Sequence, residues 1–114
     1  MSAITTHILD TSTGRPASGI DVVLEVQRGP TDWAPVGRGE TDADGRLRTL
    51  MPAGTSLEAS TYRLVFHTRP YFQRSATPTF YPHVVVVFDV ASSDAHYHVP
   101  LLLSPFGYST YRGS

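Results

Sequence analysis

The chain of 114 residues contains no cysteine and no lysine. The lack of cysteine excludes disulfides, thiolate nucleophiles and Cys-based zinc sites. The lack of lysine excludes Schiff-base chemistry and a lysine general base, because no side chain carries a primary amine. The sequence also contains no Gly-x-Ser-x-Gly nucleophile elbow, no phosphate-binding glycine loop and no His-Glu-x-x-His motif. The chemistry of these motifs is therefore excluded as well.

An excess of charge of either sign is also lacking. Nine basic residues, all of them arginine, and ten acidic residues give a net charge of -1. This balance argues against a nucleic-acid footprint and against a polybasic membrane patch. No apolar run approaches the length of a membrane span, and residues 1–7 have neither the charged nor the apolar region of a signal peptide. We therefore expect a soluble, cytoplasmic protein.

The sequence does contain a series of short strand patterns. Apolar residues alternate with mostly polar ones over residues 20–27 and 62–67, which is typical of strands buried on one face. Residues 84–88 are apolar at every position, so both faces of this strand are expected to be covered. Turn signals separate the runs. The pattern predicts one all-β domain, residues 1–114, folded as an antiparallel β-sandwich, with a short helix within residues 70–77.

The strand predicted for residues 96–103 sorts its side chains into two different faces. The odd-numbered residues 97–103 are apolar and are expected to pack in the core. The even-numbered face combines His96 and His98 with Pro100 and Leu102. A face that is neither plainly polar nor plainly core often meets another subunit. Together with the apolar run at residues 84–88, it predicts a homo-oligomer.

Three motifs carry a family resemblance. The first is His-Tyr-His-Val-Pro-Leu-Leu-Leu-Ser-Pro at residues 96–105, followed by the terminal Tyr-Arg-Gly-Ser at 111–114. The second is Thr-Thr-His-Ile-Leu-Asp at 5–10 with Thr-Gly-Arg-Pro-Ala at 13–17, and the third is Thr-Asp-Ala-Asp-Gly-Arg at 41–46. In this order the chain resembles the 5-hydroxyisourate hydrolases of the transthyretin-like family.

The resemblance implies both a fold and an activity. The implied fold is a transthyretin-like sandwich of two four-stranded antiparallel sheets with one short helix, assembled as a homotetramer with sites at subunit interfaces. The implied activity is hydrolysis of 5-hydroxyisourate to 2-oxo-4-hydroxy-4-carboxy-5-ureidoimidazoline in urate degradation, a step of purine catabolism. Water attacks a ring carbonyl and a carbon–nitrogen bond breaks, and no metal or other cofactor is implied.

The resemblance assigns His7, Arg46 and His98 to catalysis. His98 would activate or position the attacking water, because an imidazole with a pKa of about 6.5 can take up a proton near neutral pH. An arginine close by would help to keep His98 neutral. Arg46 would grip the oxygens of an anionic purine-like ring, while His7 would bind the substrate and handle protons.

The resemblance also assigns Tyr111 and Ser114, together with His7 and Arg46, to substrate binding. Ser114 offers a hydroxyl and, as the last residue, a carboxylate that would orient an imidazole. Arg112 alternates to the opposite face from Tyr111, which leaves a structural role open for it. The role of His96 also stays open.

Alternatives exist for two of these assignments. Arg48 would share a face with Arg46 in an extended chain, and it is the main competitor for the same role. His7, His96 and His98 would together suit a metal, since i,i+2 strand histidines are a common ligand pair. We rank this site below the metal-free one, because no carboxylate has an obvious place to orient the imidazoles. Residues 41–45 lack the glutamate that closes a calcium loop, so we expect a turn there.

Two other kinds of function compete with the hydrolase. A transthyretin-type protein would bind or transport a small ligand in a channel between subunits, without catalysis. The terminal motif and the pair His7 and His98, which the transport proteins do not keep, favour the enzyme instead. A structural sandwich module in a larger assembly is the second competitor, and the lack of repeats and linkers argues against it.

Overall fold

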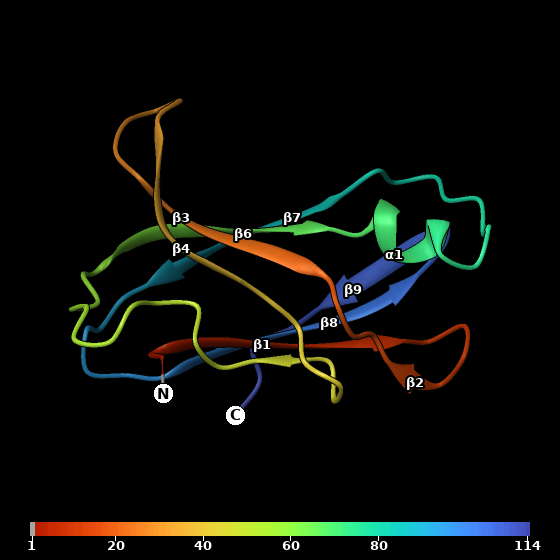
Figure 1. Cartoon of the computed structure of the whole chain (residues 1–114). Coiled ribbons are helices and arrows are strands. Elements are labelled where there is room, and N and C mark those ends of the chain that lie inside the picture. Colours follow the sequence, from red (N-terminus) through yellow and green to blue (C-terminus); the bar gives the residue numbers. More distant parts are fainter. Residues whose placement is uncertain (1) are drawn as a thin grey trace.

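The computed structural model describes residues 2–114 as two β-sheets packed face to face, with a short helix at one end (Figure 1). The elements in chain order are β1 (Ile4–Asp10), β2 (Arg15–Pro16), β3 (Asp21–Gln27), β4 (Trp33–Glu40), β5 (Arg46–Leu47), β6 (Ser60–His67), α1 (Arg69–Gln73), β7 (Val84–Val90), β8 (Tyr97–Ser104) and β9 (Gly107–Thr110).

The predicted sandwich is confirmed, with two differences in one sheet. The first sheet has the order β4-β3-β6-β7, and all its pairs are antiparallel. The second has the order β2-β1-β8-β9 with β5 also paired to β1, so it has five strands rather than four. Strands β2 and β5 have only two residues each, too few to produce a detectable alternation. In addition, β1 and β8 pair in parallel, and the chain between them contributes β3, β4, β6 and β7 to the other sheet.

Side chains from the inner faces of both sheets form the core. Alternate residues of β3, β6 and β8 are buried, as the sequence periodicity predicts, and in β8 Pro100 of the opposite face is buried as well. The largest fully buried side chains include Tyr62 and Phe66 of β6 and Leu101 of β8. The strand alternation therefore fixes which residues of β8 face inward and which remain available on the outer face.

Only one face of strand β7 is buried in the single chain, although the sequence predicted that both faces would be covered. Val84 and Val86 are buried, but Val85 and Val87 on the other face are 37% and 57% exposed. The two-layer fold explains this difference. The inner face of β7 packs against the other sheet, whereas no second layer of the same chain covers its outer face. The four consecutive valines therefore leave an apolar strip on the surface.

The predicted helix is confirmed as α1, which buries Phe72. The Tyr71 hydroxyl donates a 2.8 Å hydrogen bond to the carboxylate of buried Asp10, which ties the helix to the end of β1. Burial and this carboxylate raise the pKa of Tyr71 to about 12. No helix within residues 2–114 has the length and apolar character needed to cross a membrane.

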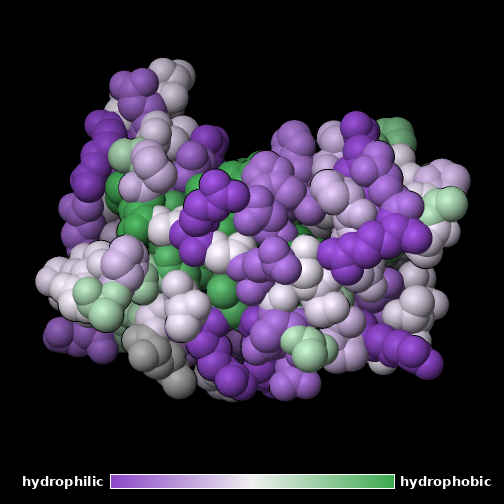
Figure 2. Space-filling model, in the orientation of Figure 1, coloured by the Kyte–Doolittle hydropathy of each residue, from purple (hydrophilic) through white to green (hydrophobic). Residues whose placement is uncertain are grey.

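The surface in the orientation of Figure 1 is mostly hydrophilic (Figure 2). Hydrophobic atoms show in a hollow beside the projecting β3–β4 hairpin. The C-terminal residues descend from β9 across the sheet that contains β1 and β8, so they lie in the same part of the molecule as the start of β1 (Figure 1).

Candidate active site

Two strand pairings bring the predicted residues together. The parallel pairing of β1 with β8 sets Thr5 beside His98 and His7 beside Pro100. On its other side β1 pairs with β5, which sets His7 beside Arg46. Directly paired residues point to the same face of a sheet. His7, Arg46 and His98 therefore share the outward face of the second sheet.

A tight turn holds Arg46 in this position. The Asp42 carboxylate accepts hydrogen bonds from the backbone N–H groups of Asp44, at 2.9 Å, and Arg46, at 3.0 Å. The bond from Arg46 is the main cause that lowers the pKa of Asp42. Gly45 has a φ of 73°, and a Cβ there would collide with the carbonyl oxygen of Ile8 in β1. The turn predicted for residues 41–45 is thus confirmed, and it packs directly against β1.

The His7 ring is tied to the same turn. Its Nε2 lies 2.9 Å from the backbone carbonyl oxygen of Asp44. A carbonyl only accepts hydrogen bonds, so the neutral ring carries its proton on Nε2. Nδ1 is then the nitrogen of His7 that can accept a proton or a hydrogen bond.

His98 is held through its Nδ1, which lies 2.8 Å from Thr5 Oγ1. The same hydroxyl lies 3.2 Å from Nε2 of His96. Although Thr5 belongs to the outward face of β1, only 4% of it is exposed. Thr5 was not predicted as a site residue. Its place two residues before His7 was the available signal, but only the β1–β8 register sets it against both histidines.

The surroundings of His98 favour its neutral form. Burial is the main cause that lowers the pKa of His98 from its ordinary value of 6.5, and the positive charge of Arg46 is the second. His7 and His96 act in the same direction with smaller effects. The expected influence of a nearby arginine is therefore confirmed, although burial contributes more. The neutral imidazole is the form that accepts a proton.

The C-terminal residues pack against His98. The Gly113 N–H donates a 2.8 Å hydrogen bond to the His98 carbonyl oxygen. A Cβ on Gly113 would lie 2.7 Å from Cδ2 of His98 and 3.1 Å from Cγ of Pro100. Glycine is therefore the residue that permits this approach. The contact brings the next residue, Ser114, into the same pocket as His98 and Arg46.

His98, Arg46 and Ser114 line a cavity of about 170 Å³, which we name the histidine pocket; His7 is not among its lining residues. Two arginines and two histidines contribute to it, no aspartate or glutamate is among its lining residues in the described chain, and the carboxylate of Ser114 is the one acidic group that the lining residues bring. A cationic cavity with planar guanidinium donors suits an anionic ligand that carries several oxygens. The lining residues are Thr5, Thr6, Arg46, Arg48, His96, His98 and Ser114.

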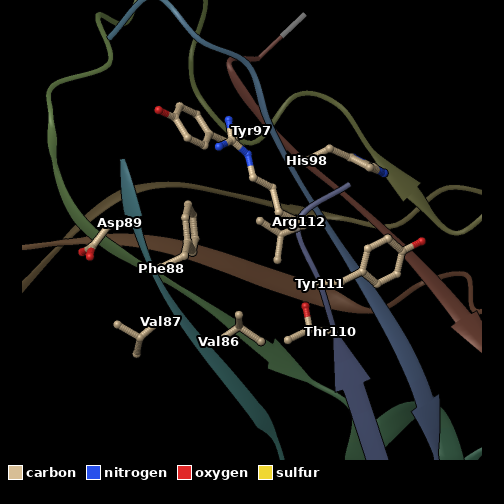
Figure 3. Close-up of a pocket in the computed structure, with 10 residues that line it drawn as sticks. Val86, Val87, Phe88, Asp89, Tyr97, His98, Thr110, Tyr111 and Arg112 are labelled. Carbon is tan, nitrogen blue, oxygen red and sulfur yellow. The ribbon is translucent and has the colours of Figure 1, made fainter. Parts of the chain in front are cut away.

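Tyr111 and Arg112 belong to a second pocket of about 220 Å³, between β7 and the C-terminal residues, which also includes His98 (Figure 3). Arg112 reaches toward Tyr97, with Cζ 4.6 Å from the ring centroid, and Tyr111 points to the opposite side (Figure 3). The expected alternation of the two side chains is present. Tyr111 is 57% exposed and does not line the histidine pocket of the same chain.

The sequence left two alternatives open: Arg48 in the role of Arg46, and a metal site formed by three histidines. Arg48 lines the histidine pocket together with Arg46, but it is exposed, whereas Arg46 is half-buried and pairs with His7. Across residues 2–114, no group of three or more His, Asp or Glu side chains is placed to hold a metal ion.

The fold and the site together define a transthyretin-like sandwich that carries histidine and arginine side chains on the outer face of one sheet. The chain belongs to the HIUase/Transthyretin family, whose sequence model matches residues 4–113. It is 47% identical over 119 residues to a 5-hydroxyisourate hydrolase of Caulobacter vibrioides, with 100% of both chains covered.

Two solved structures resemble this one closely. The Klebsiella pneumoniae 5-hydroxyisourate hydrolase has a TM-score of 0.83 and 35% identity, covering 97% of this chain and 98% of that chain. Transthyretin from Sparus aurata has a TM-score of 0.90 and 30% identity, covering 99% and 97%. Backbone similarity alone therefore does not separate an enzyme from a transthyretin, and the site residues have to make the distinction.

Replacing Gly113 by alanine tests how the C-terminal residues are held. The added Cβ meets His98 and Pro100, so we expect Gly113→Ala to break the bond to the His98 carbonyl. The free energy of unfolding in urea should fall by about 1 kcal/mol, and the NMR signals of the His98 ring should shift. Gly107→Ala is the control, because its Cβ would meet only Ser104 Oγ, at 3.7 Å. Equal losses of stability in both variants would contradict the close approach of Gly113 to His98 and Pro100.

The pKa of His98 gives a second test. The NMR titration midpoint of His98 should lie below 6.5, and Arg46→Gln should move it upward without restoring the ordinary value, because burial remains. The unfolded chain binds the proton more readily than the folded one, so stability should decline as pH falls from about 6.5 toward the folded-state pKa. Arg46→Gln should weaken this decline. An unchanged midpoint in the variant would exclude Arg46 as a cause.

Proposed function

We propose that this chain hydrolyses 5-hydroxyisourate to 2-oxo-4-hydroxy-4-carboxy-5-ureidoimidazoline in urate degradation. The observation that carries the proposal is a neutral-favoured His98 beside Arg46 in a cationic pocket. The relatives named 5-hydroxyisourate hydrolase match this chain over nearly its whole length, which supports the same activity here. Residues 1–114 then act as one hydrolase domain, without a metal or other cofactor.

In this proposal His98 is the group that removes a proton from water. A carbon–oxygen bond forms at the ring carbonyl while the ring nitrogen of His98 that Thr5 does not engage accepts the proton. The ring carbon–nitrogen bond then breaks, and the proton passes from His98 to the departing nitrogen. The net change is the addition of one water across the carbon–nitrogen bond, so no covalent intermediate with the protein is needed.

Arg46 and His7 hold the substrate in this mechanism. The Arg46 guanidinium donates to oxygens of the anionic ring and to the oxyanion that develops at the attacked carbonyl. His7 offers Nδ1 as an acceptor for a substrate N–H or O–H, because its Nε2 is bonded to Asp44. Ser114 adds a hydroxyl from the C-terminal side of the same pocket. Arg48 is the exposed second cation, and we assign the primary role to the half-buried Arg46.

The alternative is a transthyretin-type protein that binds a small ligand without catalysis. The fold favours neither function, because the TM-score to a transthyretin is 0.90 and that to a hydrolase is 0.83. The pocket supports the enzyme. A site for a hydrophobic ligand has no need of a half-buried arginine next to an imidazole whose pKa is lowered.

We further propose a homotetramer with active sites at the subunit interfaces. Strand β7 is a sheet edge with seven residues, no proline and outward-facing Val85 and Val87, and such edges pair readily with another strand. A second copy of the same strand is the natural partner for a closed, two-fold interface. Tyr111, exposed beside the second pocket, is then positioned for a neighbouring subunit's substrate.

The balanced net charge supports a cytoplasmic protein with no nucleic-acid or membrane partner.

Changing His98 to alanine tests the catalytic assignment. We expect the folded variant to lose a factor of about 10²–10⁴ in rate, because the proton acceptor is gone. The rate is followed by ultraviolet absorbance of 5-hydroxyisourate freshly made from urate with urate oxidase. The exposed His67, outside both pockets, gives the matched control His67→Ala, which should keep the wild-type rate.

Two results would refute parts of this proposal. Near-normal turnover by His98→Ala would remove His98 from catalysis. A wild-type oligomer that leaves the substrate to decay at its spontaneous rate would instead be a binding protein on the same scaffold.

The subunit contact has its own test. Val87→Arg places a charge on the outward face of β7, so we expect sedimentation velocity to give a species smaller than four chains. Val87→Ile keeps the face apolar and should keep the tetramer. A tetramer that survives Val87→Arg would exclude this face of β7 from the interface.

A further inference from the structure

Thr5 places one hydroxyl between two imidazoles. Its Oγ1 lies 2.8 Å from Nδ1 of His98 and 3.2 Å from Nε2 of His96. The distance to His98 is fixed by the β1–β8 ladder, in which Thr5 and His98 are paired residues. Thr5 is 4% exposed, so little water is available to replace either imidazole as its partner.

The number of protons on these groups links the two histidines. A threonine hydroxyl has one proton to donate, and a neutral imidazole carries one N–H. When Thr5 donates to one ring nitrogen, the other ring has to donate its N–H to the Thr5 oxygen for both contacts to be hydrogen bonds. The proton position on His98 therefore depends on the proton position on His96, through a residue that has no other assigned role.

We propose that Thr5 and His96 are positioning residues that hold His98 as the Nδ1–H tautomer. This inference rests on the proposed function, in which His98 accepts a proton from water. Nδ1 is engaged by Thr5, so the accepting nitrogen is Nε2, and it needs a free lone pair. His98 then donates Nδ1–H to Thr5, Thr5 donates its hydroxyl proton to His96 Nε2, and neutral His96 carries its own proton on Nδ1.

Protonation of His96 reverses this arrangement. A protonated imidazole has N–H on both nitrogens, so His96 has to donate to Thr5. The Thr5 proton is then free for Nδ1 of His98, which favours the other tautomer and occupies Nε2. The charged or titratable groups around this pair are His7 on β1, Arg46 on β5, Arg48 just after it and the carboxylate of Ser114.

The tautomers are measured directly by long-range ¹H–¹⁵N correlation spectra of the folded, full-length protein. We expect neutral His98 in the wild type to be the Nδ1–H form. Thr5→Val keeps the branched shape but removes the hydroxyl, and it should shift His98 toward the Nε2–H form. Thr5→Ser keeps the hydroxyl and should restore the wild-type spectrum. A wild-type His98 with its proton on Nε2, or a tautomer unchanged in Thr5→Val, would overturn the inference.

Thr41→Val is the matched control for loss of a buried threonine hydroxyl. Thr41 is also 4% exposed, and its hydroxyl bonds the Ala17 carbonyl and the Ile20 N–H, away from both pockets. We expect this variant to lose stability while the His98 tautomer stays as in the wild type. If Thr41→Val shifts the His98 signals as much as Thr5→Val does, general destabilisation causes the shift and the proposal is wrong.

Kinetics separate the inference from the proposed function. Thr5→Val should lower kcat roughly tenfold, the value of one hydrogen bond, with little change in KM, and Thr5→Ser should recover most of it. His96→Ala should lower kcat in the same direction, because Thr5 loses the acceptor of its hydroxyl proton. If His98→Ala is inactive while Thr5→Val changes neither tautomer nor kcat, the inference is wrong and the hydrolase stands. If the tautomer shifts but His98→Ala is fully active, the Thr5 linkage stands and the catalytic role of His98 is wrong.

Discussion

The parallel ladder between β1 and β8 is the contact on which the site depends. Its inner side contributes Ile4, Ile8 and Leu101 to the core, and none of the three is exposed to solvent. The outer side of the same ladder sets Thr5 against His98. A shift of one residue would move every side chain to the opposite face, so burial of the inner side chains fixes the register of the outer ones. The stability of the sandwich and the geometry of the histidine pocket are therefore two consequences of one pairing.

Around this ladder, backbone contacts bring the remaining groups close to His98. The Asp42 turn holds Arg46 and engages His7, and Gly113 brings the C-terminal end onto β8. Each of these contacts partly excludes water from His98 or places a cation beside it, and both effects lower its pKa. The base form of His98 is thus a property of the assembled face rather than of the imidazole alone.

The same scaffold serves proteins with different functions because the two faces of its sheets are independent. The inner face needs apolar side chains of suitable volume, whereas the outer face is free to vary. The backbone is similar to that of both a hydrolase and a transthyretin, with TM-scores of 0.83 and 0.90. In this chain, the outer face of β1, β5 and β8 carries the histidine pocket, and the outer face of β7 carries the apolar strip that we propose as a subunit contact.

The sequence by itself determined the features that depend on neighbouring residues: the alternation of β3, β6 and β8, the short helix near Phe72 and the turn before Arg46. Its motifs also predicted His7, Arg46 and His98 as site residues, and the strand pairings place the three on one face. Tertiary structure alone decided that β1 and β8 are parallel, that Thr5 lies between His96 and His98, and that Tyr111 lies apart from the histidine pocket. The physical reason is how far apart the interacting residues lie along the chain. Alternation and turns are set by residues a few positions apart, whereas Thr5 and His98 are 93 positions apart and meet only because the core on the other side of their sheet admits a single register.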